Sequence, residues 1–174
     1  MQVEIVGEFK SMILTKINPR KALNKAFLKV KPSRSDIESF KKNLVNLIDR
    51  INEAESEEFH KNLVSHFLRE TYYGSSHFIN TKGWNDLVIH NGKDSKSTVG
   101  VILEAKNPTN RSEMIKADNL NTKAFQELIL YYLRERITAK NLEIKYLVAT
   151  NIYEWFIFDA GVFERTFAQN KALV

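Results

Sequence analysis

Residues 99–106 read VGVILEAK, and this apolar run limits the folds that are open to the chain. A continuous run of this length, without alternation of polar residues, is expected of a strand that is covered on both faces. Such a strand needs a sheet around it and helices on both sides of that sheet. Glu104 and Lys106 close the run with only Ala105 between them. The run therefore predicts a central strand that ends in two charged side chains.

Helical patterns precede this strand. Ser35 followed by Glu38 matches an N-cap with a capping box, and apolar residues at helical spacing predict a helix over residues 35–55. A second amphipathic helix is expected over 56–73. A shorter helical pattern over 18–31 opens at an Asn-Pro pair and ends before a proline, since the residue before proline avoids the α region.

After residue 76 the pattern changes to that of strands with one more long helix. We expect strands at 77–80, 84–90, 99–106, 143–150 and 154–158, a helix at 120–136, and the start of a helix in the last dozen residues. This order predicts an α/β protein with a mixed central sheet flanked by helices and with an N-terminal helical extension.

Composition excludes several classes of protein. The chain has 174 residues, of which 43% are hydrophobic, as expected of a globular domain. It has no cysteine, which rules out disulfides, thiolate metal sites and a cysteine nucleophile. No apolar run approaches the roughly 20 residues of a membrane helix, and the N-terminus lacks a signal-peptide core. We therefore expect a cytoplasmic protein without membrane contact.

The charge of the chain favours a polyanionic partner. The formal net charge is +5, and residues 9–35 hold eight Lys or Arg without any Asp or Glu. A solvated basic arm, an arm that contacts phosphates and a transit peptide all fit this segment.

Asp86 lies near the start of the strand that precedes the apolar run. Side chains alternate along a strand, so Glu104 and Lys106 share a face, and an adjacent strand would bring Asp86 close to them. Two neighbouring carboxylates repel unless a cation lies between them, and Mg²⁺ prefers such oxygen ligands. Lys106 could then orient or help to deprotonate a water. An ordinary ion pair at a strand end fits the same spacing.

The half-motifs Asn85-Asp86 and Glu104-Ala105-Lys106 resemble those of the PD-(D/E)xK nuclease superfamily, although the proline expected before the aspartate is absent. Longer segments are similar to the N-terminal region of single-chain Type IIG restriction–modification enzymes. These segments are NPRKALNKAFLKVKP, KGWNDLVIHNGKD, FQELILYYLRERIT and ATNIYEWFIFDA, and the similarity runs from about residue 18 to the end of the chain.

The resemblance implies a restriction-endonuclease-like fold with a magnesium site, in which Mn²⁺ can replace Mg²⁺. Asp86 and Glu104 would ligate the ion, with the Ala105 carbonyl as a further ligand. Lys106 would serve the attacking water. Gln126 would match a glutamine on the helix after the catalytic strand.

Such families often add a glutamate from the first core helix, and the spacing of the resemblance favours Glu58. A helical wheel instead places Glu57 and Glu70 beside the apolar face of that helix. The phosphates of double-stranded DNA would face basic residues of the loop after the apolar run, Arg111, Lys116 and Lys123.

The resemblance also implies an organisation and a role. Residues 1–55 would form a basic helical region, and residues 56–174 an endonuclease domain of a longer chain. Methyltransferase and target-recognition regions would follow it, and the enzyme would serve in phage defence. A double-strand break would need a second copy, through a dimer on DNA or through two nicking events. A repair or recombination nuclease of the same fold and a catalytically silent DNA-binding module remain open as alternatives.

Overall fold

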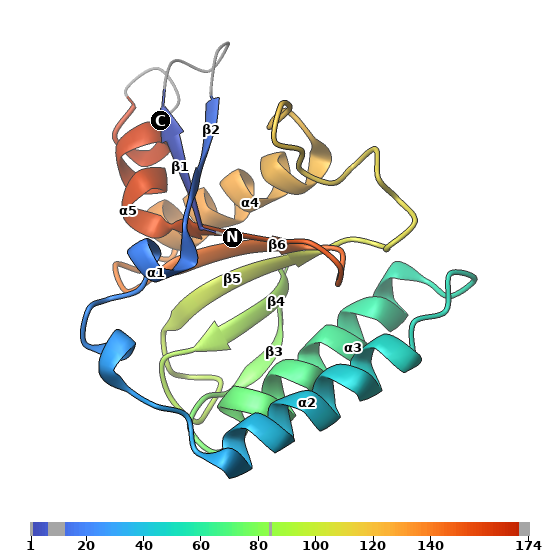
Figure 1. The fold of residues 1–174 in the computed structure, drawn as a ribbon. Coiled ribbons are helices and arrows are strands. Elements are labelled where there is room, and N and C mark those ends of the chain that lie inside the picture. The colour runs from blue at the N-terminus through green and yellow to red at the C-terminus, as the bar shows by residue number, and fades with distance from the viewer. Residues whose placement is uncertain (1, 7–12, 84, 171–174) are drawn as a thin grey trace.

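The computed structural model describes residues 2–6, 13–83 and 85–170, which form a mixed sheet with helices on both faces (Figure 1). The strands lie in the order β2-β1-β7-β6-β5-β4-β3. The pairs β1–β7 and β5–β6 are parallel, and the neighbouring pairs are antiparallel. The predicted α/β class with a mixed, helix-flanked sheet is therefore confirmed.

The strands are β1 (Gln2–Val6), β2 (Ile13–Ile17), β3 (Ile79–Lys82), β4 (Asn85–His90), β5 (Val99–Ala105), β6 (Tyr146–Thr150) and β7 (Trp155–Asp159). The α-helices are α1 (Pro19–Ala22), α2 (Arg34–Asp49), α3 (Glu57–Leu68), α4 (Lys123–Leu133) and α5 (Ala160–Phe163). Helices α3, α4 and α5 each continue into a π-helical turn, at Arg69–Tyr73, Arg134–Thr138 and Glu164–Ala168. Among the described residues, no helix is long and apolar enough to cross a membrane.

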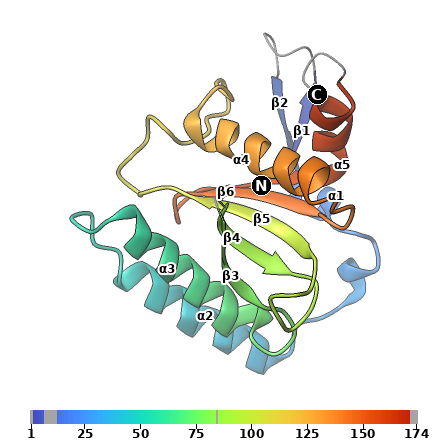
Figure 2. The ribbon, with the colours of Figure 1, turned by 180° about the vertical axis from the view of Figure 1, so that it is seen from behind.

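Strand β5 is covered on both faces, as its apolar run predicts. Ile102 lies in the core between the sheet and helices α4 and α5, whereas Leu103 lies in the core on the side of α2 and α3. Figures 1 and 2 show the two helical layers on opposite sides of the sheet. Both side chains are almost fully buried, so the end of β5 is held rigidly from both sides.

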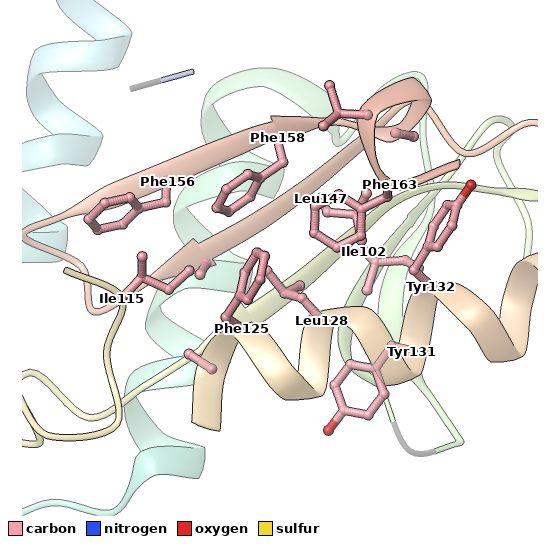
Figure 3. Packing of buried hydrophobic residues seen from close by; sticks show 14 of the residues in the cluster. Ile102, Ile115, Phe125, Leu128, Tyr131, Tyr132, Leu147, Phe156, Phe158 and Phe163 are labelled. Atoms are coloured by element: carbon pink, nitrogen blue, oxygen red, sulfur yellow. The ribbon is translucent and has the colours of Figure 1, made fainter. Parts of the chain in front are cut away.

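Aromatic rings fill the core under α4 and α5 (Figure 3). The ring of Phe163 is fully buried, and its centroid lies 5.7 Å from that of Phe125 and 5.5 Å from that of Phe158. Figure 3 shows that Tyr131, although it is also on α4, points away from these rings. Packing of this kind fixes the rotation of α4 about its axis, and thereby decides which of its polar residues face the end of β5.

The N-terminal region differs from the expected helical extension. Strands β1 and β2 pair as an antiparallel hairpin, and β1 joins the sheet beside β7. The helix expected over 18–31 is reduced to α1 and a 3-10 turn at Phe27–Lys29. A strand gains most of its stability from its pairing partner, and here that partner, β7, is far away in the sequence.

The other expected elements are present with shifted ends. Helix α2 starts earlier than expected, β3 starts two residues late, and the strand expected from residue 143 begins at Tyr146. Trp84, at the expected start of β4, and residues 171–174 of the expected final helix lie outside the described residues.

The start of α2 gives a test with a matched control. Ser33, rather than Ser35, is the N-cap: its Oγ accepts a hydrogen bond from the Asp36 amide, and the Asp36 carboxylate accepts one from the Ser33 amide. Ser33→Ala should lower the free energy of unfolding by about 1 kcal/mol. Ser35→Ala should leave it nearly unchanged. Urea unfolding of both variants measures this, and equal losses would contradict the assigned cap.

Candidate metal centre

Asp86 and Glu104 are cross-strand neighbours on β4 and β5. The antiparallel register pairs Leu87 with Leu103, so the next residues, Asp86 and Glu104, lie opposite each other on one face. Asp86 Oδ2 accepts a hydrogen bond of 3.2 Å from the Ala105 amide. Glu104 is only 1% exposed. The strand register thus brings the two predicted carboxylates together.

A third carboxylate comes from the first turn of α3. Ser56 caps this helix through a hydrogen bond of 3.1 Å from the Phe59 amide to its Oγ, which places Glu57 at the helix start. Carboxylate oxygens of Glu57, Asp86 and Glu104 all lie within 4.8 Å of one another. The side chain of Glu57 is 40% exposed, so this group of three carboxylates is open to solvent at one side.

Lys106 lies among these acids and is itself buried. Its Nζ is 2.5 Å from Glu104 Oε1, 2.7 Å from Glu127 Oε2 and 3.4 Å from Glu57 Oε1. Its backbone amide donates to the Thr150 carbonyl at 2.8 Å, which ties the end of β5 to β6. Sequence reasoning therefore found the strand lysine but missed Glu127, its partner on α4.

Burial and repulsion shift the pKa values of this pair. Burial, followed by the charge of Asp86, raises the pKa of Glu104 to about 9, although Lys106 acts in the opposite direction. Burial alone would lower the pKa of Lys106, but Glu104, Glu127 and Glu57 together raise it above its usual range. These shifts keep Lys106 charged and favour a proton on Glu104 at neutral pH.

Glu104 Oε2 is buried without a hydrogen-bond partner, and Glu127 Oε2 likewise lacks a hydrogen bond but contacts Lys106 as an ion pair. A buried carboxylate oxygen without a partner is costly, because its lost hydration is not replaced. Glu104 Oε2 belongs to the same three carboxylates, Glu57, Asp86 and Glu104, that could hold one ion. Carboxylates are the ligands that Mg²⁺ and Mn²⁺ prefer, so the donor set fits the predicted cation.

A second lysine adjoins the site from α3. Lys61 forms ion pairs with Glu58 and, at 3.6 Å, with Asp86 Oδ1. Burial alone would lower the pKa of Lys61, but Glu58 and Asp86 raise it. Asp86 is thus held through both oxygens, by Lys61 and by the Ala105 amide. Lys61 was not among the predicted site residues.

The helix residues that the resemblance favoured, Glu58 and Gln126, do not lie beside the other two carboxylates or Lys106. Glu58 is 60% exposed and pairs with Lys61, so Glu57 takes the place that Glu58 was expected to fill. Glu70 is exposed and lines a shallow groove between α2 and α3. Gln126 is exposed and donates a hydrogen bond of 2.8 Å to Asn121, whereas its neighbour Glu127 reaches Lys106.

The predicted DNA-facing residues lie in or after the loop that follows β5. Arg111 and Lys116 are exposed. Lys123 pairs with Glu113 at 3.2 Å, and Glu113 lies 4.0 Å from Lys106. Their contact with DNA, like the role of the Ala105 carbonyl, stays a prediction.

The basic N-terminal segment lies elsewhere. Figures 1 and 2 show the chain between α1 and α2 at the end of the sheet opposite the start of α3 and the loop after β5. Lys21, Lys25 and Lys29 in this segment are exposed. The chain between α1 and α2 therefore lies away from the surface around the carboxylates.

Comparison with known proteins gives a family without an assigned activity. Residues 17–174 match a family described as a domain of unknown function, DUF7149. No curated protein and no solved structure matches the chain. The match begins at the last residue of β2 and covers every later element, including the strands and helices that carry the carboxylates. The chain therefore belongs to the DUF7149 family.

Proposed function

We propose that the chain is a magnesium-dependent endonuclease domain of restriction-endonuclease-like fold that hydrolyses DNA phosphodiesters. One observation carries the proposal: three carboxylates converge at the ends of two central strands, one oxygen of Glu104 lacks a partner, and a buried lysine lies beside them. The resemblance of the two half-motifs and four further segments to Type IIG restriction–modification enzymes supports double-stranded DNA as the substrate.

Glu57, Asp86 and Glu104 would hold the cation. When bound, it would lower the pKa of a coordinated water and stabilise negative charge on the phosphate. Lys61 and the Ala105 amide keep the Asp86 carboxylate oriented toward the group. The antiparallel pairing of β4 with β5 keeps Asp86 and Glu104 opposed, so this part of the site is formed before any ligand arrives.

Lys106 acts as a donor in this scheme. Its raised pKa keeps the ammonium charged at neutral pH in the cation-free protein. The ammonium can donate hydrogen bonds that orient the attacking water, and it can offset charge on the phosphate. The contacts of Lys106 with Glu104 and Glu127 thus support the orienting role more than that of a general base.

Calorimetric titration with Mn²⁺ tests the proposal together with DNA cleavage. Wild type should bind one ion, and Asp86→Asn should bind it at least about tenfold more weakly, because one ligand oxygen becomes a neutral amide. Glu38→Gln removes an exposed carboxylate on α2 and serves as the control, with unchanged binding.

The cleavage assay uses supercoiled plasmid with Mg²⁺ or Mn²⁺, and flap and junction DNA for comparison. Cation-dependent nicking by wild type that is lost in Asp86→Asn is the expected result. A preference for branched DNA would favour the repair alternative. Absence of cation binding by wild type, or equal binding by Asp86→Asn, would overturn the proposed site.

A further inference from the structure

The close partners of Lys106 fall into two groups. Glu104 Oε1 at 2.5 Å and Glu57 Oε1 at 3.4 Å belong to the three carboxylates that would hold the cation. Glu127 Oε2 at 2.7 Å does not belong to them. Glu113 is farther away, at 4.0 Å, and has a closer partner in Lys123. Among the described residues, Glu127 is thus the one close carboxylate of Lys106 that a cation would leave in place.

Helix α4 holds Glu127 in this position. Ala124, Leu128 and Tyr131 are buried, and Glu127 lies between them on the helix with a side chain that is 25% exposed. Phe125, two residues before Glu127, packs against Phe158 and Phe163 in the aromatic core (Figure 3). The helix therefore cannot rotate to replace Glu127 by its neighbour Gln126 without breaking that core.

A cation among Glu57, Asp86 and Glu104 would change the forces on Lys106. It would bind the carboxylate oxygens of Glu104 and Glu57 in competition with Lys106, and it would repel the ammonium directly. The ammonium would be driven away from the place where a water must be oriented, unless another anion opposed that force. Glu127 lies where it can do so, since it approaches Lys106 from α4, whereas Glu57 approaches from α3.

We propose that Glu127 is the positioning residue that retains Lys106 in the site once a divalent cation occupies the three carboxylates. This role rests on the proposed nuclease function. Lys106 passes from a position shared between Glu104 and Glu127 to one held by Glu127, without leaving the end of β5.

Glu127→Gln tests this role because it keeps the shape of the side chain and removes its charge. Mn²⁺ affinity should stay within about threefold of wild type, and KM for DNA should stay unchanged. The kcat should fall about 10- to 100-fold, as is typical when a partner that orients a site residue is lost. Glu38→Gln again serves as the control for removal of an exposed carboxylate.

A double-mutant cycle separates positioning from a structural role. In a Lys106→Met background, Glu127→Gln should have no further effect on kcat, because the group that it positions is gone. Several results would overturn the role of Glu127: an unchanged kcat, additive losses in the cycle, or a loss of Mn²⁺ affinity as large as that in Asp86→Asn. A loss of kcat in Gln126→Ala instead of Glu127→Gln would show that α4 acts through Gln126.

An NMR measurement keeps this proposal distinct from the proposed function. The ammonium signal of Lys106, assigned by its absence in Lys106→Met, should remain protected from solvent exchange in wild type with Mg²⁺. It should lose that protection in Glu127→Gln. If wild type binds Mg²⁺ but cleaves no DNA, the proposed nuclease function is wrong, and the ammonium signal of Lys106 still tests whether Glu127 retains Lys106 in the site. If wild type binds no cation, both proposals are wrong.

Discussion

Glu104→Gln should abolish cation-dependent cleavage and, at the same time, make the cation-free protein more stable at pH 8. The loss of cleavage should be at least about 1,000-fold, because a cation stabilises the charge that develops in the transition state of phosphate hydrolysis by several kcal/mol. The gain in stability follows from the environment of the carboxyl group. Glu104 is buried, lies opposite Asp86, and has one oxygen without a hydrogen-bond partner.

The sign of the stability change follows from proton binding. The pKa of Glu104 is raised to about 9 in the folded protein from a usual value of 4.5. Between these two values the folded state binds more protons than the unfolded state, so stability falls as pH rises. The slope is at most about 1.4 kcal/mol per pH unit for one proton. Glu104→Gln lacks this slope, so its advantage over wild type should grow from pH 5 to pH 9.

Thermal unfolding in the presence of EDTA, repeated across this pH range, measures the effect. A gain of about 1–3 kcal/mol at pH 8 corresponds to a rise in Tm of roughly 2–10 °C for a chain of this size. Saturating Mn²⁺ should raise the Tm of wild type and leave that of Glu104→Gln unchanged. If the Tm of Glu104→Gln in EDTA is instead below that of wild type at every pH, Glu104 serves as a structural partner of Lys106 and not as a cation ligand.

The patterns that depend on local periodicity predicted the core of the fold correctly. The apolar run of β5 is a strand buried on both faces, and α3 and α4 lie where residues at helical spacing placed them. A helix buried along one stripe, or a strand buried on both faces, shows a recognisable pattern of apolar residues within a short window of sequence. Such elements can be predicted without knowledge of distant contacts.

Strands β1 and β2 were missed because the hairpin that they form joins the sheet only through β1 and the distant strand β7. Gln2 pairs with Ile157 and Val3 with Phe158, at the far end of the chain. The first four residues of QVEIV alternate between polar and apolar residues, which is a signal that could have revealed β1, whereas ILTKI shows no such alternation. Residues 13–17, which form β2, lie within the basic segment 9–35 and were read as part of it.

The carboxylates on the strands were easier to predict than the acids on the helices. Antiparallel register makes Asp86 and Glu104 neighbours whatever the details of packing. Adjacent residues on a helix point about 100° apart. A helix turned about its axis by that angle would therefore present Glu58 to the site in place of Glu57, or Gln126 in place of Glu127. The helical wheel already favoured Glu57 over Glu58, and the spacing taken from the resemblance led away from it.

Cation binding should release close to one proton at pH 7, and its affinity should rise steeply with pH. Glu104 holds a proton below a pKa of about 9, and a cation binds the ionised carboxylate. Each fall of one pH unit below that value should therefore weaken binding by up to tenfold. Between pH 6 and pH 8.5 the expected change approaches about 300-fold, far beyond what a pair of exposed carboxylates with ordinary pKa values would give.

Calorimetry with Mn²⁺ in buffers of different ionisation enthalpy counts the released protons directly. Asp86→Asn provides an informative comparison, because Asp86 is, after burial, the largest cause of the raised pKa of Glu104. In that variant the remaining binding should depend less steeply on pH and should release fewer protons. An affinity that stays flat from pH 6 to pH 8.5 would mean that Glu104 is already ionised. Lys106, 2.5 Å away, would then neutralise it fully, and the cluster would carry no surplus charge to attract a cation.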